Sequence, residues 1–408
     1  MIWMVGVTWM KKLMLLGGLR YLLPVIESAH RMGYYVITVD YLPDNVAHRF
    51  SDEYHNVSIL DREAVLELAK KLKIDGIMSF ACDPGVLTAA YVADKMQLPS
   101  PGPYESVRIL QNKGLFRDFL EKHGFNVPLH KSYTDKISPL DDVKNFNWPL
   151  IVKPVDLAGS KGVTRVDREC DLSAAVEMAF RCSFTKEIII EEYLEKMGYA
   201  SDSDCFSIDG EIVFSSFNCQ YFDERAANPY TPAGFVWPSN MPQKSVDELE
   251  SEVQRLISLL NMGTSIYNVE TRLALNGKPY IMEVSPRGGG NRLAEIVKLV
   301  YGVDLIAANI NGALGMPVSI AAHQSDTCWA EYIVHSEKQG KFRDLEIDEE
   351  FRCKYVVEND LWVSFGDKVE AFTGANQTIG TIVLHFDSED QARLMLPRIK
   401  DYIRVVVD

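Results

Sequence analysis

The sequence lacks the features that mark several large classes of protein. It holds no run of about 18 uncharged apolar residues, the minimum for a membrane-spanning helix. Its seven cysteines are scattered and form no CxxC pair, so neither a disulfide framework nor a zinc site is expected. Positive charge is not in excess, because the net charge is −15. We therefore expect a cytoplasmic protein without a nucleic-acid or membrane partner.

Two common nucleotide-binding motifs are also missing. The turn Gly17-Gly18-Leu19-Arg20 lacks the GxGxxG spacing of a dinucleotide-binding domain, and GxxxxGK[ST] does not occur. No internal repeat or low-complexity tract is found. A nucleotide site in this chain must therefore be built from other elements.

The first quarter of the chain alternates continuous apolar strands with amphipathic helices. This alternation over residues 10–112 predicts a doubly wound parallel α/β sheet, with LMLLGG as its first strand. We interpret residues 1–9 as an extension, or an alternative start, before Met10.

A β-hairpin is predicted over residues 267–284. The runs YNVETRLAL and KPYIMEV are joined by Asn276-Gly277, and both residues tolerate the positive φ of a two-residue hairpin turn. The resulting register pairs Leu275 with Lys278, Leu273 with Tyr280 and Glu270 with Glu283. Two opposed carboxylates repel each other, so we expect a divalent cation between Glu270 and Glu283, and hard oxygen ligands favour Mg²⁺ (or Mn²⁺).

A glycine run follows the second strand of this hairpin. Residues 285–291, SPRGGGN, lead into the apolar, helix-period segment RLAEIVKLVYG. Backbone N–H groups at the start of a helix favour an anion, although three glycines also suit a plain flexible turn. The whole segment EVSPRGGGNRLAEIV resembles the EINPR-type signature of the ATP-grasp ligases. It is most similar to the L-amino-acid ligase and carbamoyl-phosphate-synthase-like branch.

This resemblance implies ATP as the nucleotide and assigns residues to it. Lys113 would reach the phosphates, Lys153 would contact the α-phosphate side, and the loop over residues 156–163 would close over the β- and γ-phosphates. The assigned nucleotide-binding residues are Lys113, Lys153, Gly159, Ser160, Lys161, Gly162, the adenine segment Glu191, Glu192, Tyr193 and Leu194, and Asp202 or Asp204 for the ribose.

The resemblance also implies the reaction and the remaining site residues. An ATP-grasp carboxylate–amine ligase activates a carboxylate as an acyl phosphate, and an amine then displaces the phosphate. Arg287 and Arg272 are the candidate catalytic residues, and Gly288, Gly289 and Gly290 are the candidates for substrate binding. One departure concerns the metal: the usual Asn two residues after the second glutamate is Ser285 here, so Ser285 or Asn291 would take that ligand position.

The expected organisation is an N-terminal α/β domain over 1–110, an ATP-grasp domain over 111–318 with a lid at about 130–190, and a small C-terminal α+β domain over 319–408. Residues 228–242 are expected to form a long loop on the substrate side. The expected partners are a small-molecule carboxylate and an amine, and a homodimer is left open. Two other functions also remain open: an enzyme that only phosphorylates or carboxylates a small molecule, and a nucleotide-binding protein without turnover.

Overall fold

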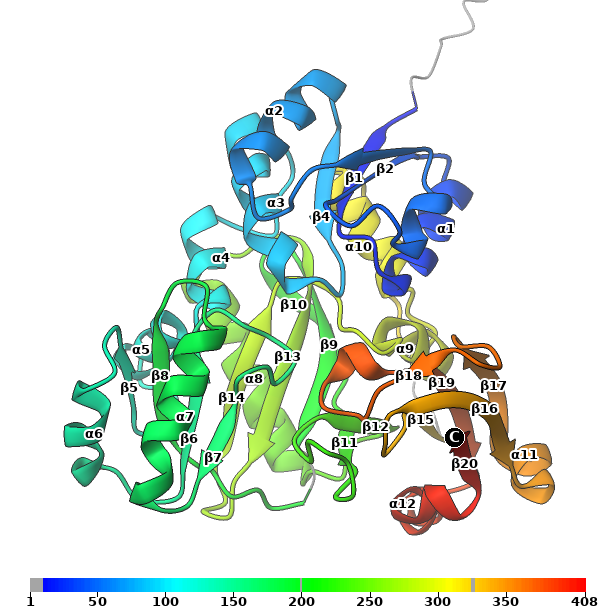
Figure 1. Cartoon of the computed structure of the whole chain (residues 1–408). Helices are drawn as coiled ribbons and strands as arrows, with labels where there is room; N and C mark the ends of the chain where they lie inside the picture. The colour runs from blue at the N-terminus through cyan, green and yellow to red at the C-terminus, as the bar shows by residue number, and fades with distance from the viewer. Residues whose placement is uncertain (1–9, 199, 324–326) are drawn as a thin grey trace, which may run out of the picture.

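The computed structural model describes residues 10–198, 200–323 and 327–408. The extension expected at residues 1–9 lies outside the described residues. Figure 1 shows three lobes, with the N-terminal sheet at the top, the segment from β5 to β8 at the lower left and the C-terminal sheets at the lower right. The central sheet, which contains β9, β13 and β14, lies between them.

The N-terminal sheet is parallel, in the order β3-β2-β1-β4. Alternate residues of β1 face two separate cores: Leu13 and Leu15 pack with α1, whereas Met14 and Leu16 pack with α2 and α3. Apolar helices on both faces confirm the doubly wound layout. The elements here are β1 (Lys12–Leu16), η1 (Arg20–Leu22), α1 (Leu23–Arg31), β2 (Tyr35–Asp40), η2 (Val46–Arg49), β3 (Glu53–Asn56), α2 (Arg62–Leu72), β4 (Gly76–Ser79) and α3 (Asp83–Met96).

The helix α10 (Leu305–Ala313) returns to this sheet from much later in the chain. Its apolar residues Leu305 and Ile310 lie in the same core as Leu13 and Leu15. The Lys11 ammonium donates to the Leu314 carbonyl at 2.9 Å. One face of the N-terminal sheet is therefore covered partly by a distant segment.

The second sheet is antiparallel, in the order β5-β8-β6-β7, and α7 packs against it. This sheet covers the segment in which a lid is expected, and its role as a lid stays a prediction. Its elements are β5 (His130–Tyr133), α6 (Ser138–Asp142), η3 (Val143–Asn145), β6 (Leu150–Pro154), β7 (Thr164–Val166), α7 (Glu169–Cys182) and β8 (Ile188–Glu192); α4 (Tyr104–Gln111) and α5 (Lys113–Lys122) precede it.

The central sheet has the order β10-β9-β13-β14. Its apolar face packs against α8, in a core that contains Tyr267, Val269, Ile281 and Val284. The opposite face is therefore left for polar residues. The elements are β9 (Ser201–Ile208), β10 (Glu211–Ser215), α8 (Gln243–Leu259), β13 (Ser265–Leu273), β14 (Pro279–Ser285) and α9 (Leu293–Tyr301).

Two sheets form the C-terminal part. The five-stranded one has the order β11-β12-β15-β19-β17 and the three-stranded one β18-β16-β20. The elements are β11 (Cys219–Phe222), β12 (Pro232–Trp237), β15 (Cys328–Val334), β16 (Gly340–Ile347), α11 (Glu349–Tyr355), β17 (Val356–Leu361), β18 (Lys368–Val369), η4 (Ala375–Gln377), β19 (Gly380–Phe386), α12 (Glu389–Met395), η5 (Leu396–Asp401) and β20 (Ile403–Val407).

The expectation of one long loop over 228–242 is wrong, because residues 232–237 form the buried strand β12. Phe235 and Trp237 fill the core between this sheet and α9, which requires an ordered strand. The segment therefore joins the C-terminal sheet. Its role as a wall of the substrate site stays a prediction.

The hairpin register is partly wrong at the turn and right at the carboxylates. Leu273 lies opposite Pro279 and not Tyr280, because the loop has three residues and Ala274 bonds to the Lys278 carbonyl. A β-bulge between Glu270 and Thr271 then shifts the register by one residue and brings Glu270 opposite Glu283. The two irregularities cancel. The bulge was signalled by Ile281 and Val284, which are three residues apart and both buried, so strict alternation must break between them.

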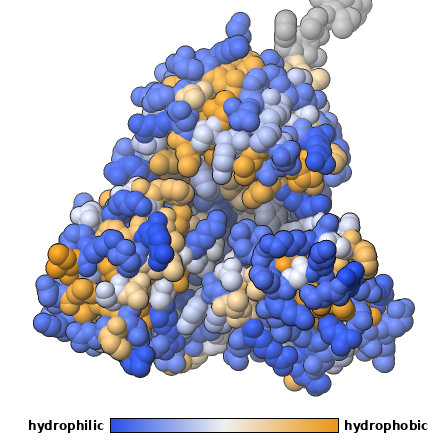
Figure 2. All heavy atoms as spheres, viewed as in Figure 1, coloured by the Kyte–Doolittle hydropathy of each residue, from blue (hydrophilic) through white to orange (hydrophobic). Residues whose placement is uncertain are grey.

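No helix of the described residues is long and apolar enough to cross a membrane. The face shown in Figure 2 is dominated by hydrophilic residues, with apolar ones in small groups.

Candidate active site

The polar face of the central sheet presents two rows of three polar residues. Strand pairing places Asp202 of β9 opposite Glu270 of β13, and Glu270 opposite Glu283 of β14. The next row is formed in the same way by Asp204, Asn268 and Ser285. Directly opposed residues share one face of a sheet, so all six side chains project together.

The first row concentrates negative charge. Burial raises the pKa of Glu270, and the charge of Glu283 adds to this effect. Burial, and then the charge of Glu270, raises the pKa of Asp202 to about 8. Lys113 partly compensates, since its ammonium lies 3.0 Å from Glu283 Oε2. The row therefore favours a cation.

The second row contains one amide side chain, that of Asn268 on β13. The family resemblance would place an amide at position 285 on β14, where this chain has Ser285. Asn268 lies directly opposite Ser285, so the amide stands on β13 instead of β14. Its Nδ2 donates to Asp202 Oδ1 at 2.6 Å and its Oδ1 accepts from Arg287 at 2.9 Å. Ser285 Oγ donates to Asp83 and accepts from Gln111. Sequence reasoning missed Asn268, although its position two residues before Glu270 placed it on the same face.

A buried ion cluster lies in the second sheet. Glu191 contacts Lys153 at 2.6 Å and Arg117 at 2.7 Å, and only 3% of its side chain is exposed. Burial alone would raise the pKa of Glu191, but the charges of Arg117 and Lys153 outweigh it and lower the pKa to about 2. Burial lowers the pKa of Lys153, and Glu191 opposes that shift. Glu191 therefore orients Lys153; its predicted contact with the adenine base stays a prediction.

The expected phosphate loop lies between β6 and β7. Gly159, Ser160 and Gly162 all have positive φ, a conformation that glycine adopts without steric cost. The Leu157 carbonyl accepts from Lys113 at 2.8 Å. The loop is thus adjacent to the lysine that faces Glu283. Lys161 lies in the same loop, and its contact with the nucleotide stays a prediction.

The expected adenine segment follows β8. Tyr193 N donates to the Pro149 carbonyl, and the Leu194 carbonyl accepts from Arg272 at 3.0 Å. The Glu192 carboxylate accepts from Asn147. Arg272 therefore links the central sheet to this segment, and its role as a catalytic residue remains a prediction.

Arg287 is held rigidly beside the second row. Its guanidinium makes two bonds to Asp83, at 2.9 and 2.8 Å, and one to Asn268. Burial would raise the pKa of Asp83, but Arg287 outweighs it and lowers the pKa. Asp83 begins α3 after the short connection that follows β4, at the carboxyl edge of the N-terminal sheet, where ligand sites of such sheets lie. The position of Asp83 after a predicted strand of a parallel sheet could have identified it as a site residue from the sequence.

The glycine run packs into that same edge. The Gly288 carbonyl accepts from Ala81 N at 3.1 Å, and a Cβ at Gly288 would overlap the ring of Phe80. Gly289 N donates to Asp204 at 2.9 Å. The run is therefore a close-packed segment and not a free turn. Asn291 has a positive φ and accepts from the Tyr21 hydroxyl at 3.0 Å, so its side chain contacts the N-terminal part.

The donor set fits Mg²⁺ with a nucleotide. Within the described ranges, no group of three or more His, Cys, Asp or Glu is arranged to hold a metal ion alone. Mg²⁺ is ordinarily held by one or two carboxylates, with the other positions filled by phosphate oxygens and water. Glu270 and Glu283 can supply the two carboxylates, and Lys113 and the loop over residues 156–163 lie beside them, where the phosphates of a nucleotide would bind.

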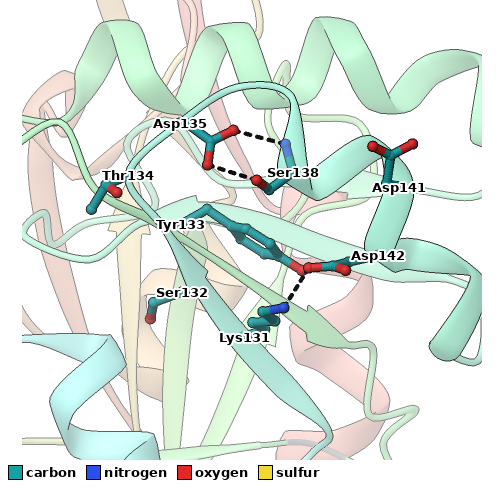
Figure 3. Close-up of a pocket in the computed structure, with 8 residues that line it drawn as sticks. All are labelled: Lys131, Ser132, Tyr133, Thr134, Asp135, Ser138, Asp141 and Asp142. Atoms are coloured by element: carbon teal, nitrogen blue, oxygen red, sulfur yellow. Dashed lines mark hydrogen bonds and ion pairs between the residues drawn. The ribbon is translucent and has the colours of Figure 1, made fainter.

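A separate hollow of about 430 Å³ lies on the second sheet, between β5 and α6. Figure 3 shows its polar lining, in which Asp135 caps Ser138 and Lys131 pairs with Asp142. None of the predicted site residues lines it. It is therefore distinct from the two polar rows.

Comparisons with known proteins agree with this layout. Residues 146–295 match the family model described as ATP-grasp domain. The chain is 26% identical over 343 residues to the uncharacterized protein y4rH of Sinorhizobium fredii, covering 81% of this chain and 68% of the relative. It is 24% identical over 287 residues to the carbamoyl phosphate synthase large chain of Clostridium beijerinckii, covering 69% of this chain but only 26% of that protein.

Two solved structures extend the comparison to nearly the whole chain. The L-amino acid ligase from Bacillus licheniformis superposes with a TM-score of 0.81 at 21% identity, covering 98% of this chain and 99% of that one. The phosphoribosylglycinamide synthetase from Anaerococcus prevotii gives 0.75 at 21% identity, covering 98% and 100%.

Residues 146–295 therefore match an ATP-grasp domain, and the likeness to two solved structures over nearly the whole chain confirms the predicted fold class. The similar proteins with named activities are a ligase, a synthetase and a carbamoyl phosphate synthase, in line with the enzyme class proposed below. The domain boundaries and the role of each site residue stay predictions.

Proposed function

We propose that this chain is an ATP-dependent carboxylate–amine ligase that forms an amide bond through an acyl phosphate and releases ADP and phosphate. The observation that carries this proposal is the juxtaposition of the acidic row with Arg287. Glu270 and Glu283 suit a metal–phosphate group, and Arg287, which follows β14 and bonds to Asn268 of the adjacent row, offers a fixed positive charge.

The nucleotide side of the site belongs to Lys113, Lys153 and the loop over residues 156–163. Mg²⁺, held by Glu270 and Glu283, would supply neutralisation of the phosphate charge. Lys113 lies between Glu283 and the loop, so its ammonium is placed to follow the phosphates. Glu191 fixes the orientation of Lys153.

The chemistry has two steps. A carboxylate oxygen of the substrate attacks the γ-phosphorus, and the bond from that phosphorus to the bridging oxygen of ADP breaks. The amine nitrogen then attacks the carbonyl carbon, the carbon–oxygen bond to phosphate breaks, and the nitrogen loses a proton. Arg287 stabilises the negative oxygens that develop in both steps. Because Asp83 and Asn268 hold the guanidinium, this donor is already oriented before the reaction.

The further metal-ligand position, beyond Glu270 and Glu283, fits Asn268 or Ser285 better than Asn291. Both lie in the row adjacent to the carboxylate pair, whereas the Asn291 side chain contacts Tyr21 of the N-terminal part. We propose that the amide of Asn268 replaces the one that relatives of this type carry on the other strand.

The test is ADP release screened over a matrix of carboxylates and amines. We expect release only when both a carboxylate and an amine are present, together with an amide product. Release with a carboxylate alone would instead indicate simple phosphorylation, and a requirement for bicarbonate would indicate carboxylation. Binding of Mg-ATP without release in any combination would contradict an enzymatic function.

A further inference from the structure

Two loops meet at the carboxyl edge of the N-terminal sheet. The strand order β3-β2-β1-β4 reverses between β1 and β4, and ligands of such sheets bind outside the carboxyl ends of the strands at this point. The loop after β1 lies against the loop after β4, because a Cβ at Gly17 would be 3.2 Å from Cys82 Sγ. On its other side, a Cβ at Gly18 would overlap the ring of His48. The loop that leads to Arg20 is therefore fixed between its two neighbours.

Arg20, the first residue of η1, is a partly buried cation without a counter-ion in the part of the chain that the structure describes. Its guanidinium has no ion pair or hydrogen bond with the described residues, and its contact is with the Trp362 ring, 5.5 Å from the centroid. The arginines Arg31, Arg62 and Arg108 of the same region each lie beside a carboxylate. The N–H donors of Arg20 are therefore available to a ligand.

Trp362 holds this guanidinium in a defined place. The indole nitrogen donates to Asp360 at 2.7 Å, and the Tyr21 ring meets the indole edge-on at 5.9 Å, so the ring is itself fixed. A guanidinium that lies over an aromatic ring keeps the N–H groups at its own edge free. These groups form a planar fork that matches the two oxygens of one carboxylate. Arg20 is therefore oriented as a donor to an anionic group.

Arg20 and Arg287 lie at the same edge of the sheet. The neighbour of Arg20, Tyr21, donates through its hydroxyl to Asn291 of the glycine-run segment at 3.0 Å. A Cβ at Gly290 would meet only the Tyr21 ring among the described residues, at an ordinary contact distance of 3.9 Å, so the space beside Gly290 is open. The loop after β4 holds Arg287 through two guanidinium bonds. A substrate that binds Arg287 therefore has room to extend towards the loop of Arg20.

We propose that Arg20 binds a second carboxylate of the substrate, so that the carboxylate-bearing substrate is a dicarboxylic acid. The proposal rests on the proposed function and names the substrate class of that site. Arg287 takes the carboxylate that reacts, and Arg20 takes the one that does not. A single guanidinium matches the single charge of a carboxylate, whereas a phosphate ester carries nearly two charges and calls for more than one cation.

The experiment measures equilibrium binding, so it does not require turnover. The protein is saturated with Mg²⁺ and a non-hydrolysable ATP analogue, and succinate, glutarate and adipate are each titrated by calorimetry beside their own monoamides. The monoamide has the same size without the second charge, and the three lengths cover different separations of the two guanidinium groups. Phosphoglycolate and glycolate form a fourth pair. The variants are Arg20→Gln and Arg20→Lys, with Arg31→Gln, at an exposed position on α1, as control.

We expect the wild type and Arg31→Gln to bind at least one dicarboxylate at least about tenfold more tightly than its monoamide. Arg20→Gln should lose this preference and bind the monoamide unchanged. Arg20→Lys should keep part of the preference, since a lysine keeps the charge without the planar fork.

Three results would overturn the proposal: equal binding of acid and monoamide in every pair by the wild type, binding of neither member of any pair, or a preference retained in Arg20→Gln. An Arg20-dependent preference for phosphoglycolate that exceeds the preference for every dicarboxylate would overturn the assignment to a carboxylate.

A further variant separates recognition from a structural role. If the contact of Arg20 with Trp362 only joined the N-terminal and C-terminal parts, Trp362→Leu and Arg20→Gln would lower the melting temperature alike, and neither would change the preference for the dicarboxylate. That result would overturn the proposal. We expect Trp362→Leu to keep a reduced preference, because the guanidinium remains and loses only its aromatic support.

The test also distinguishes this proposal from the ligase function on which it rests. An Arg20-dependent preference without ADP release in the presence of any amine would support the site and contradict the ligase function. ADP release that is as fast with the monoamides as with the dicarboxylates, without a difference in binding, would contradict the site alone.

Discussion

Asp83 fixes Arg287 through both of its carboxylate oxygens, across a separation of 204 residues in the chain. The pair joins the first turn of α3 to the segment that follows β14. The N-terminal part therefore sets the orientation of the guanidinium that we assign to the reacting carboxylate.

We expect Asp83→Asn to lower kcat by about 10- to 100-fold, because an amide cannot accept both guanidinium bonds and a small misplacement of the donor is costly. Mg-ATP affinity should stay within about twofold, since the side chain of Asp83 bonds to Ser285 and Arg287 and not to Lys113 or Lys153. Asp94→Asn, on the exposed side of the same helix, is the control. If Asp83→Asn lowered the affinity for Mg-ATP by as much as it lowers kcat, the assignment of Asp83 to the reacting carboxylate and not to the nucleotide would be contradicted.

Removing either predicted phosphate lysine should weaken nucleotide binding. Lys113→Met and Lys153→Met each lose one charge-assisted contact, which corresponds to about 10- to 100-fold in the Kd of Mg-ATP by calorimetry. Their stabilities should differ. Lys153 is buried against Glu191, so its loss leaves a carboxylate with Arg117 alone and lowers the melting temperature more than the loss of Lys113 does. Wild-type affinity in both variants would refute the two assignments.

Glu283→Ala should abolish turnover, whereas Arg287→Ala should spare ATP binding and reduce kcat by about 10²–10³-fold. We assign Glu283 to the metal and the phosphates, which would already be bound in the ground state, and Arg287 to charge that develops during the reaction. The paired readouts are calorimetry with Mg-ATP and ADP release. Glu211→Ala, an exposed carboxylate on β10 of the same sheet, should behave as the wild type. Substantial turnover in Glu283→Ala would remove the metal assignment.

Glu191 should make stability depend on acid pH. Its pKa falls from an ordinary value of 4.5 to about 2 in the folded protein, so its contribution is complete above about pH 5 and is lost as the pH falls towards 2. The shift corresponds to about 3 kcal/mol in the free energy of unfolding. Glu191→Gln should therefore be strongly destabilised at pH 6 and approach the wild type near pH 2. Chemical unfolding at a series of pH values measures this difference, with Glu195→Gln at an exposed position as control. A difference in the free energy of unfolding between the wild type and Glu191→Gln that does not change with pH would contradict the prediction.

The opposed carboxylates were predictable because sequence spacing reflects local pairing. The prediction of Glu270 opposite Glu283 survived a three-residue turn and a β-bulge only because their shifts cancel. The N-terminal sheet and the ATP-grasp fold were predictable for a similar reason. The alternation of apolar strands with helices indicates the sheet, and one contiguous motif indicates the fold, so each signal lies within a short stretch of sequence.

Other features depend on contacts between distant segments, which one sequence does not encode in a local pattern. Nothing near Arg287 indicates that Asp83 binds it, and nothing near Lys153 indicates that Arg117 shares its carboxylate. The strand β12 was hidden because its proline and glycine are typical of loops, although Phe235 and Trp237 are core residues.

The return of α10 to the N-terminal sheet has a consequence for synthesis on the ribosome. Domains near the amino end of a chain generally fold first, as they emerge. Here the Lys11 ammonium bonds to a carbonyl 303 residues further along, and Leu13 and Leu15 share a core with Leu305 and Ile310. The first sheet to be translated therefore keeps one apolar face incomplete until most of the protein has been made, and a nascent chain that stalls before this helix presents that face to chaperones and proteases.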